Sequence, residues 1–201
     1  MQRYSGALTR EQFMLREMRI VAGLRQAGLS DEEILEKVRA ENLFQYPTEK
    51  EIRRKGRQCL KRVGFLADMP GILRAMAEGQ ADEAALAALI GMMGCSRVMA
   101  EFMETVVAEK YRTLDYSLGA RDVNLFFMRL SEQDEGVAGW SAATVNKIRQ
   151  VILHALREAG VLSQKGELLP VCLPDEFRRE LKQAGHGAFL PALNEWELVF
   201  G

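Results

Sequence analysis

The chain has 201 residues, 48% of them hydrophobic and 27% charged, which is the composition of a globular protein and excludes a disordered one. Its formal net charge of −1 excludes a strongly basic protein that coats nucleic acid indiscriminately. The charge is uneven, because residues 1–66 hold 14 basic and 9 acidic side chains, residues 67–140 hold 6 and 12, and residues 141–201 hold 7 and 7. A nucleic-acid-binding face at the N-terminal end is compatible with this distribution.

Cysteine usage and hydropathy bear on the compartment. Cys59, Cys95 and Cys172 lie far apart and are odd in number, so we expect neither a disulfide framework nor a cysteine-based metal site. The N-terminal sequence MQRYSGALTREQ lacks the apolar core of a signal peptide, and the longest small-apolar run, residues 84–95, is too short to span a bilayer. We therefore expect a soluble cytoplasmic protein with no membrane association.

Two capping boxes predict the first two helices. Thr9 is followed three residues later by Gln, so we expect a helix that begins at Thr9 and continues to about residue 28. Ser30 is followed three residues later by Glu, which predicts a short helix over residues 31–40.

The stretch TEKEIRRKGRQCLKRVG, residues 48–64, holds seven Lys and Arg. At 100° per residue its apolar side chains form one stripe, and most of its cations fall on the opposite face. Thr48 is the predicted cap and Gly64 the predicted end of this helix. We interpret the cationic face as a candidate phosphate-binding element, and a solvated surface face is the alternative. The candidate contact residues are Lys50, Arg53, Arg54, Arg57 and Lys61.

Three helices joined by tight connections and ending in a cationic one are typical of a helix-turn-helix unit. The alternative is a three-helix fragment of an ordinary bundle. After it, residues 70–119 are rich in Ala, Met and Leu and predict further helices. Their methionines are expected to fill the core, with a Met-lined groove for a partner helix as the alternative. The acidic character of this segment should repel nucleic acid.

The last third predicts a winged helix. A helix over residues 120–132 precedes a turn, a cap at Ser141 and a second helix to Ala159, and two short strands are expected near residues 161–172. In a winged helix the second helix enters the major groove, where Asn and Gln can bind adenine edges and cations bind phosphates. Protein docking by the same unit is the alternative. The candidate contact residues are Asn146, Lys147, Gln150 and Arg157.

The C-terminal end predicts one more helix, capped by Asp175, and a tail that packs back on the body through Trp196 and Phe200. Catalytic patterns are scarce. The two histidines, His154 and His186, have no metal-binding partner at helical spacing, and no P-loop or dinucleotide fingerprint occurs. We therefore expect no enzyme, no cofactor and no metal site; two carboxylates one helical turn apart, Glu101 and Glu104, are the weak alternative.

The N-terminal sequence YSGALTREQFMLREMRIVAGL, followed by GLSDEEILEKVRAENLFQYPTEKEIRRKGRQCLKRV, resembles the opening of the BrxA family, a component of bacterial BREX bacteriophage-exclusion systems. The resemblance is strongest over residues 4–63. It implies a small cytoplasmic helical protein with nucleic-acid-binding helix-turn-helix elements, which works beside the larger methyltransferase, ATPase and other proteins of the system. It carries over no catalytic residues.

Together these patterns predict a mainly α fold. It comprises an N-terminal helix-turn-helix-like unit (1–66), an acidic helical middle (67–119) and a C-terminal winged-helix-like unit with one small β-hairpin (120–201). The favoured function is a non-catalytic double-stranded-DNA-binding accessory protein of a BREX system, with other BREX proteins as partners. A protein-interaction adaptor without nucleic-acid binding is the alternative, and RNA binding comes third because no aromatic-bearing sheet is predicted.

Overall fold

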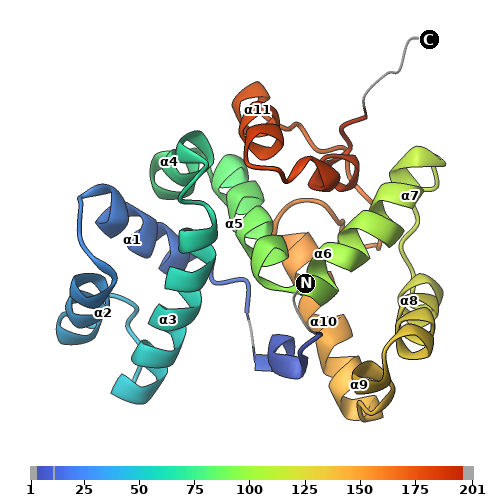
Figure 1. Cartoon of the computed structure of the whole chain (residues 1–201), viewed down its shortest axis with the longest axis horizontal. Helices are drawn as coiled ribbons and strands as arrows, with labels where there is room; N and C mark the ends of the chain where they lie inside the picture. Colours follow the sequence, from blue (N-terminus) through green and yellow to red (C-terminus); the bar gives the residue numbers. More distant parts are fainter. Residues whose placement is uncertain (1–3, 11, 197–201) are drawn as a thin grey trace.

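The computed structural model describes residues 4–10 and 12–196, and within them the chain is mainly helical, as predicted (Figure 1). A 3₁₀ helix, η1 (Gly6–Arg10), comes first, and a π-helical segment, Met103–Val107, joins α6 to α7. The α-helices in chain order are α1 (Leu15–Gln26), α2 (Asp31–Ala40), α3 (Glu49–Phe65), α4 (Pro70–Glu78), α5 (Ala81–Cys95), α6 (Arg97–Phe102), α7 (Ala108–Arg112), α8 (Ala120–Gln133), α9 (Glu135–Ala138), α10 (Ala142–Glu158) and α11 (Asp175–Gln183).

The helices form two lobes on either side of α5. An N-terminal lobe contains α1 to α4 and a C-terminal lobe contains α6 to α10, while α11 covers one end (Figure 1). All side chains from Ala84 to Met93 are buried, because α5 packs against α3 and α4 on one side and α6 and α10 on the other. A helix that is apolar all round belongs in such a position. The expected core role of the methionines is confirmed at Met92, Met93, Met99 and Met103.

Several predicted helix starts are confirmed by their caps. Ser30 and Glu33 form the complete capping box of α2, Thr48 accepts a hydrogen bond from the Glu51 N–H at the start of α3, and Ser141 caps α10. These caps satisfy backbone N–H groups that have no partner inside the helix. The apolar stripe of α3 is buried as its spacing predicts.

The predicted start of the first helix is wrong. Thr9 lies in η1, where its hydroxyl donates to the Gly6 carbonyl, and α1 begins six residues later, at Leu15. The buried Arg62 guanidinium of α3 donates to the carbonyls of Gln12 and Phe13, at 2.8 Å and 3.0 Å. Met14, the residue before α1, has a left-handed backbone with φ of 56°, which interrupts any helix that continues from η1. We call residues 12–14, which cross from η1 to α1, the strap.

Two other expected boundaries also differ. Gly64 does not end α3, which continues through Phe65 because Gly64 keeps a helical conformation and the Leu66 N–H closes the last turn on Val63. Asp175 is the first residue of α11 and Pro174 precedes it as the cap, with no side-chain hydrogen bond at this end.

The winged-helix hairpin is not confirmed. Within the described residues, isolated bridges join Leu162 to Leu168 and Ser117 to Glu167, and no named strand is formed. The hydrogen bonds of the second predicted strand are shared with a third segment, because the Leu168 N–H donates to the Tyr116 carbonyl at 2.7 Å. The helix-turn-helix and winged-helix assignments therefore stay predictions.

The C-terminal segment, which begins with α11, packs on the N-terminal lobe as well as on the C-terminal lobe. The Glu180 carboxylate of α11 accepts the N–H groups of Gly71 and Ile72, at 2.7 Å and 2.9 Å, and so caps α4. The expected packing of the tail holds for Ala192 and Leu193, which are buried, but Trp196 is 41% exposed. Phe200 lies outside the described residues.

Within the described chain, no single helix has the length and hydropathy of a membrane span. The length and hydropathy of a span are reached only when α5 is joined to the helix from Arg97 to Arg112, and these two helices are bent by 113° relative to each other.

Candidate nucleic-acid interface

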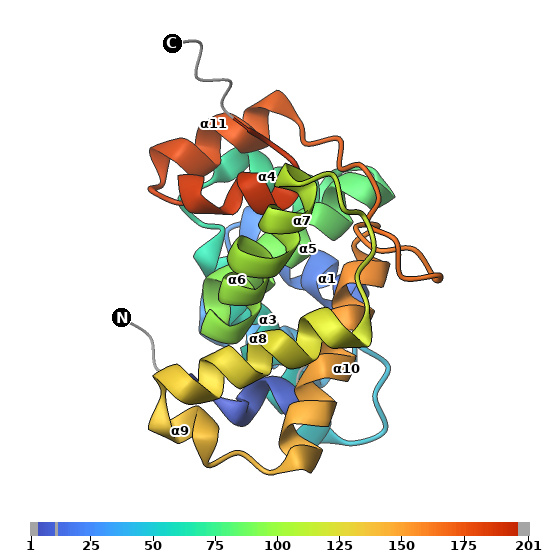
Figure 2. The same cartoon turned by 90° about the vertical axis from the view of Figure 1, so that its right-hand side faces the viewer.

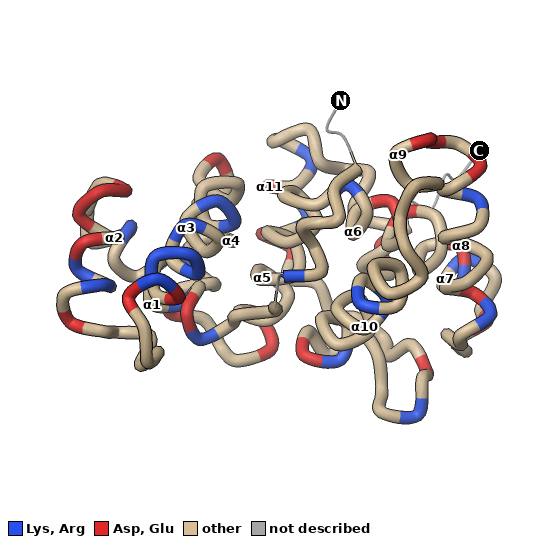
Figure 3. The backbone as a smooth tube through the Cα atoms, turned by 90° about the horizontal axis from the view of Figure 1, so that it is seen from below, with Lys and Arg blue, Asp and Glu red and all other residues tan. Residues whose placement is uncertain are grey.

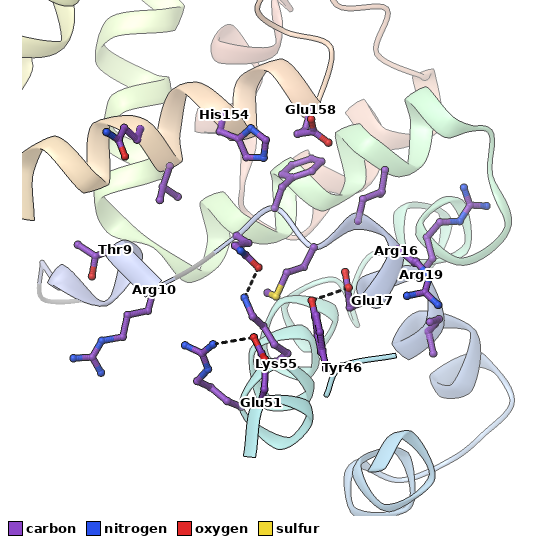
Figure 4. Close-up of a pocket in the computed structure, with 18 of the residues that line it drawn as sticks. Thr9, Arg10, Arg16, Glu17, Arg19, Tyr46, Glu51, Lys55, His154 and Glu158 are labelled. Atoms are coloured by element: carbon purple, nitrogen blue, oxygen red, sulfur yellow. Dashed lines mark hydrogen bonds and ion pairs between the residues drawn. The ribbon is translucent and has the colours of Figure 1, made fainter. Parts of the chain in front are cut away.

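A cleft of about 1110 Å³ lies between the two lobes (Figure 4). One wall comes from α1 and α3, the other from α10, and the strap runs between them. The two helices that the sequence singles out as nucleic-acid-binding, far apart in the chain, therefore border one hollow. Its charged or histidine side chains are Arg10, Arg16, Glu17, Arg19, Glu51, Arg54, Lys55, Lys147, His154 and Glu158.

The five candidate cations of α3 are all exposed, as predicted. In Figure 3, blue Lys and Arg positions follow α3 and recur on α10. Of the five, Arg54 lines the cleft and the other four do not; Lys61 instead donates to the Cys95 carbonyl at the end of α5, at 3.4 Å. Arg53 and Arg54 make long ion pairs with Glu49 and Glu51, at 3.7 Å and 3.6 Å, which are too exposed to hold them firmly. We call the four that do not line the cleft the outer cations: Lys50, Arg53, Arg57 and Lys61.

The four candidates of α10 divide in the same way. Asn146, Lys147 and Gln150 are exposed, and Lys147 and Gln150 line the cleft. Asn146 and Arg157 lie outside its lining. The Arg157 side chain is half-buried, and its Nε has no hydrogen-bond partner among the described residues.

Arginines of α1 complete the cleft, and the sequence analysis missed them. Arg16 donates to the carbonyls of Phe44 and Leu43, at 3.0 Å and 3.3 Å, and Arg19 donates to the Gly79 carbonyl at 2.9 Å. Within the described residues, neither forms an ion pair with a carboxylate, so each is fixed in place with its charge uncompensated. Their spacing, one turn apart on an amphipathic helix, was the available signal.

Lys55 and Arg62, counted in the basic stretch, serve the fold instead. They are 2% and 1% exposed. The Lys55 Nζ donates to the Gln12 side chain at 2.7 Å, while Arg62 binds strap carbonyls. Burial lowers the pKa of Lys55. Both side chains thus hold the strap in place, and the strap sets the positions of η1 and α1 relative to each other.

The acidic members of the cleft are mostly engaged. Tyr46 donates its hydroxyl to Glu17 at 2.9 Å, and burial together with this carboxylate raises the pKa of Tyr46. Glu51 pairs with Arg54, and Glu158 lies beside His154 on α10 (Figure 4). Six Lys or Arg against three Glu give the lining a net charge of +3 with histidine neutral. Such a lining is suited to an anion.

The comparisons with known proteins identify the family. The BrxA family profile matches residues 2–185. The chain belongs to the BrxA family. A BREX protein BrxA from Bacillus cereus (strain H3081.97) is 30% identical over 193 residues, which cover 94% of this chain and 96% of that protein. The family resemblance of the N-terminal sequence is confirmed, and it extends over nearly the whole chain.

The BrxA-family fold also occurs in a crystal structure. An uncharacterised protein from Magnetospirillum magneticum superposes with a TM-score of 0.78 at 19% sequence identity, covering 96% of this chain and 98% of that one. At this identity the likeness shows a shared fold and nothing of shared ligands. It supports the two-lobed arrangement of the helices.

Proposed function

We propose that this BrxA-family chain is a non-catalytic accessory protein of a BREX phage-defence system, and that it binds double-stranded DNA in the cleft between its lobes. One observation carries the proposal: cations from η1, α1, α3 and α10 line the same hollow, with a net charge of +3. Neutralising phosphates is the main source of affinity for duplex DNA. The free cysteines fit action in the reducing cytoplasm.

The fixed arginines support phosphate contact. A guanidinium already held by main-chain carbonyls, as at Arg16 and Arg19, loses little conformational freedom when it binds. Arginine also forms paired hydrogen bonds with phosphate oxygens. Gln150 on α10 is the cleft residue suited to an adenine edge, while Lys147 supplies charge.

The outer cations take a secondary part in this proposal. Lys50, Arg53, Arg57 and Lys61 contact phosphates only where the duplex extends beyond the cleft, and Asn146 and Arg157 do so on the other wall. Positioning contacts of this kind add affinity without sequence preference.

Binding is tested by fluorescence anisotropy with a short labelled duplex. The variant Arg54→Glu/Lys147→Glu reverses one exposed cation on each wall of the cleft. We expect its affinity for the duplex to fall at least tenfold, because two phosphate contacts become repulsions. The matched control is Arg179→Glu, an exposed arginine on α11 outside the cleft, which should bind as the parent does.

Circular dichroism shows that both variants are folded. If the folded double variant binds duplex DNA with parental affinity, the cleft is not the binding surface and the adaptor function takes precedence. If the parent binds a labelled RNA hairpin but not duplex DNA, and the double variant loses this RNA binding, RNA is the ligand and the proposal is wrong.

A further inference from the structure

Most of the large exposed apolar side chains of the described chain lie in or beside the C-terminal lobe. Among the described residues, six large hydrophobic side chains are exposed, and five of them lie between residues 114 and 169. Contiguous exposed apolar surface marks a site of association more often than chance. Two of the five lie on α8, two lie in the segment between α7 and α8, and one follows α10; Figure 2 looks onto α6, α7 and α8. The five are Leu114, Tyr116, Leu125, Met128 and Leu169.

A groove of about 390 Å³ lies between α8 and the continuous helix formed by α6, the π-helical segment and α7, and of the five exposed apolar side chains Leu125 lines it. Its floor is apolar: Phe126, Val106 and Leu130 line it, and the Phe126 ring meets Phe102 edge-on at 5.1 Å between ring centroids. Leu125 lines its α8 wall, and Met128 lies one turn further along that helix. A helix of a partner protein buries its apolar side in a groove of this kind.

The rim of the groove is acidic. Four carboxylates and two cations line it, which gives the lining a net charge of −2, opposite in sign to that of the cleft; two of these carboxylates, Glu101 and Glu109, pair with Arg97 and Arg112, which lie outside the lining. Asp115 and Asp122 share one ammonium group, Lys110, at 2.9 Å and 3.1 Å, which leaves one negative charge in excess at that end. Phosphate is repelled here and basic side chains are attracted.

From these features we propose that the groove between α6–α7 and α8 binds an amphipathic helix of another protein of the same BREX system, with Lys or Arg flanking its apolar face. The wall from Arg97 to Arg112 is 16 residues, or about 24 Å of helix, long enough for three to four turns of a partner. The proposal depends on the family assignment and not on DNA binding.

A second copy of this chain does not supply such a helix. The basic amphipathic helices of the described chain are α1, α3 and α10, and each already buries its apolar face in the core: α1 at Met18 and Val21, α3 at Ile52 and Val63, and α10 at Ile148 and Ile152. A partner with an uncommitted basic amphipathic helix is therefore the occupant that fits both the floor and the rim.

The test uses the affinity-tagged chain expressed together with the remaining proteins of its BREX operon. Leu125→Lys/Met128→Lys places positive charge on two side chains that are 37% and 50% exposed, so the fold should tolerate it. We expect one BREX protein to co-purify with the parent and its recovery to fall at least tenfold with this variant. Glu109→Lys, an exposed rim carboxylate, should lower recovery by a smaller factor.

The matched control is Arg54→Glu/Lys147→Glu, because it alters the cleft alone. This cleft variant should recover the protein partner as the parent does, while the groove variant should retain any DNA binding. Replacing Leu125, which lines the groove, by p-benzoylphenylalanine then identifies the partner segment by photo-crosslinking and mass spectrometry. A crosslink to a helical segment with Lys or Arg in that BREX protein supports the proposal. Unchanged recovery with the groove variant, or a crosslink to a second copy of this chain or to an acidic segment, overturns it.

Discussion

Arg54 and Arg57 lie one turn apart on α3 and are both exposed, but of the two only Arg54 lines the cleft. The sequence places them on one cationic face and predicts equal parts in DNA binding. The structure distinguishes them. Replacing each by Gln, one at a time, removes one positive charge without adding a repulsion. Comparing the two variants therefore shows whether the duplex lies in the cleft or along the outer side of α3.

The magnitude follows from counterion release. The cleft offers Arg10, Arg16, Arg19, Arg54 and Lys147, since Lys55 is buried. At roughly −0.9 per phosphate contact, these five contribute about −4.5 to the slope of log affinity against log salt, or about a 500-fold loss between 50 mM and 200 mM salt. Arg54→Gln should reduce that contribution to about −3.6, so the loss over the same range becomes about 3.5-fold smaller.

Anisotropy titrations at four or more salt concentrations measure the slopes of the parent, Arg54→Gln and Arg57→Gln. Arg57→Gln should retain the parental slope on a duplex short enough to lie within the cleft. If Arg57→Gln flattens the slope while Arg54→Gln does not, the duplex lies along the outer face of α3 and the assignment of the cleft is wrong.

Two further predictions concern stability. A methyl group at Gly94 would lie 2.3 Å from ring atoms of Phe65, so Gly94→Ala should lower the unfolding free energy by about 1–3 kcal/mol in urea titrations. The control Gly64→Ala places its methyl group in open space inside α3 and should not lower the unfolding free energy. Equal stability of the two variants would show that the Phe65 ring moves aside at no cost. Burial raises the pKa of the Cys59 thiol from 9.0 to about 12, so the unfolded chain loses this proton first and stability falls as pH rises above 9. Relative to Cys59→Ala, the parent should lose about 1.4 kcal/mol between pH 8 and pH 10, and a constant difference would contradict the shift.

Local patterns predicted the helices well because their causes are local. The caps at Ser30, Thr48 and Ser141 and the apolar stripe of α3 involve residues within a few turns of one another. The false start at Thr9 involves a distant contact: Arg62 binds the strap carbonyls, and the left-handed Met14 separates η1 from α1. Helical periodicity cannot reveal a donor that arrives from 50 residues away.

The candidate site was predicted in part for a similar reason. The exposed cations of α3 follow from its periodicity, but the same periodicity places Lys55 and Arg62 beside Cys59 on the buried stripe, and the high count of basic residues obscured this. Which exposed cations share a cleft depends on how α1, α3 and α10 pack, and no spacing within one helix contains that information.

The 3₁₀ helix η1, near the N-terminus, packs on α10, near the C-terminus, and this affects the order of folding. Residues 6–10 pack on α10, and the Tyr4 hydroxyl donates to Glu101, 97 residues further along. During synthesis α1 to α4 can associate while η1 still has no surface to bind. Because such distant contacts form slowly, η1 is made before α1 but docks only once α10 is present, and the hollow between the lobes acquires its final shape only after residue 158 has been made.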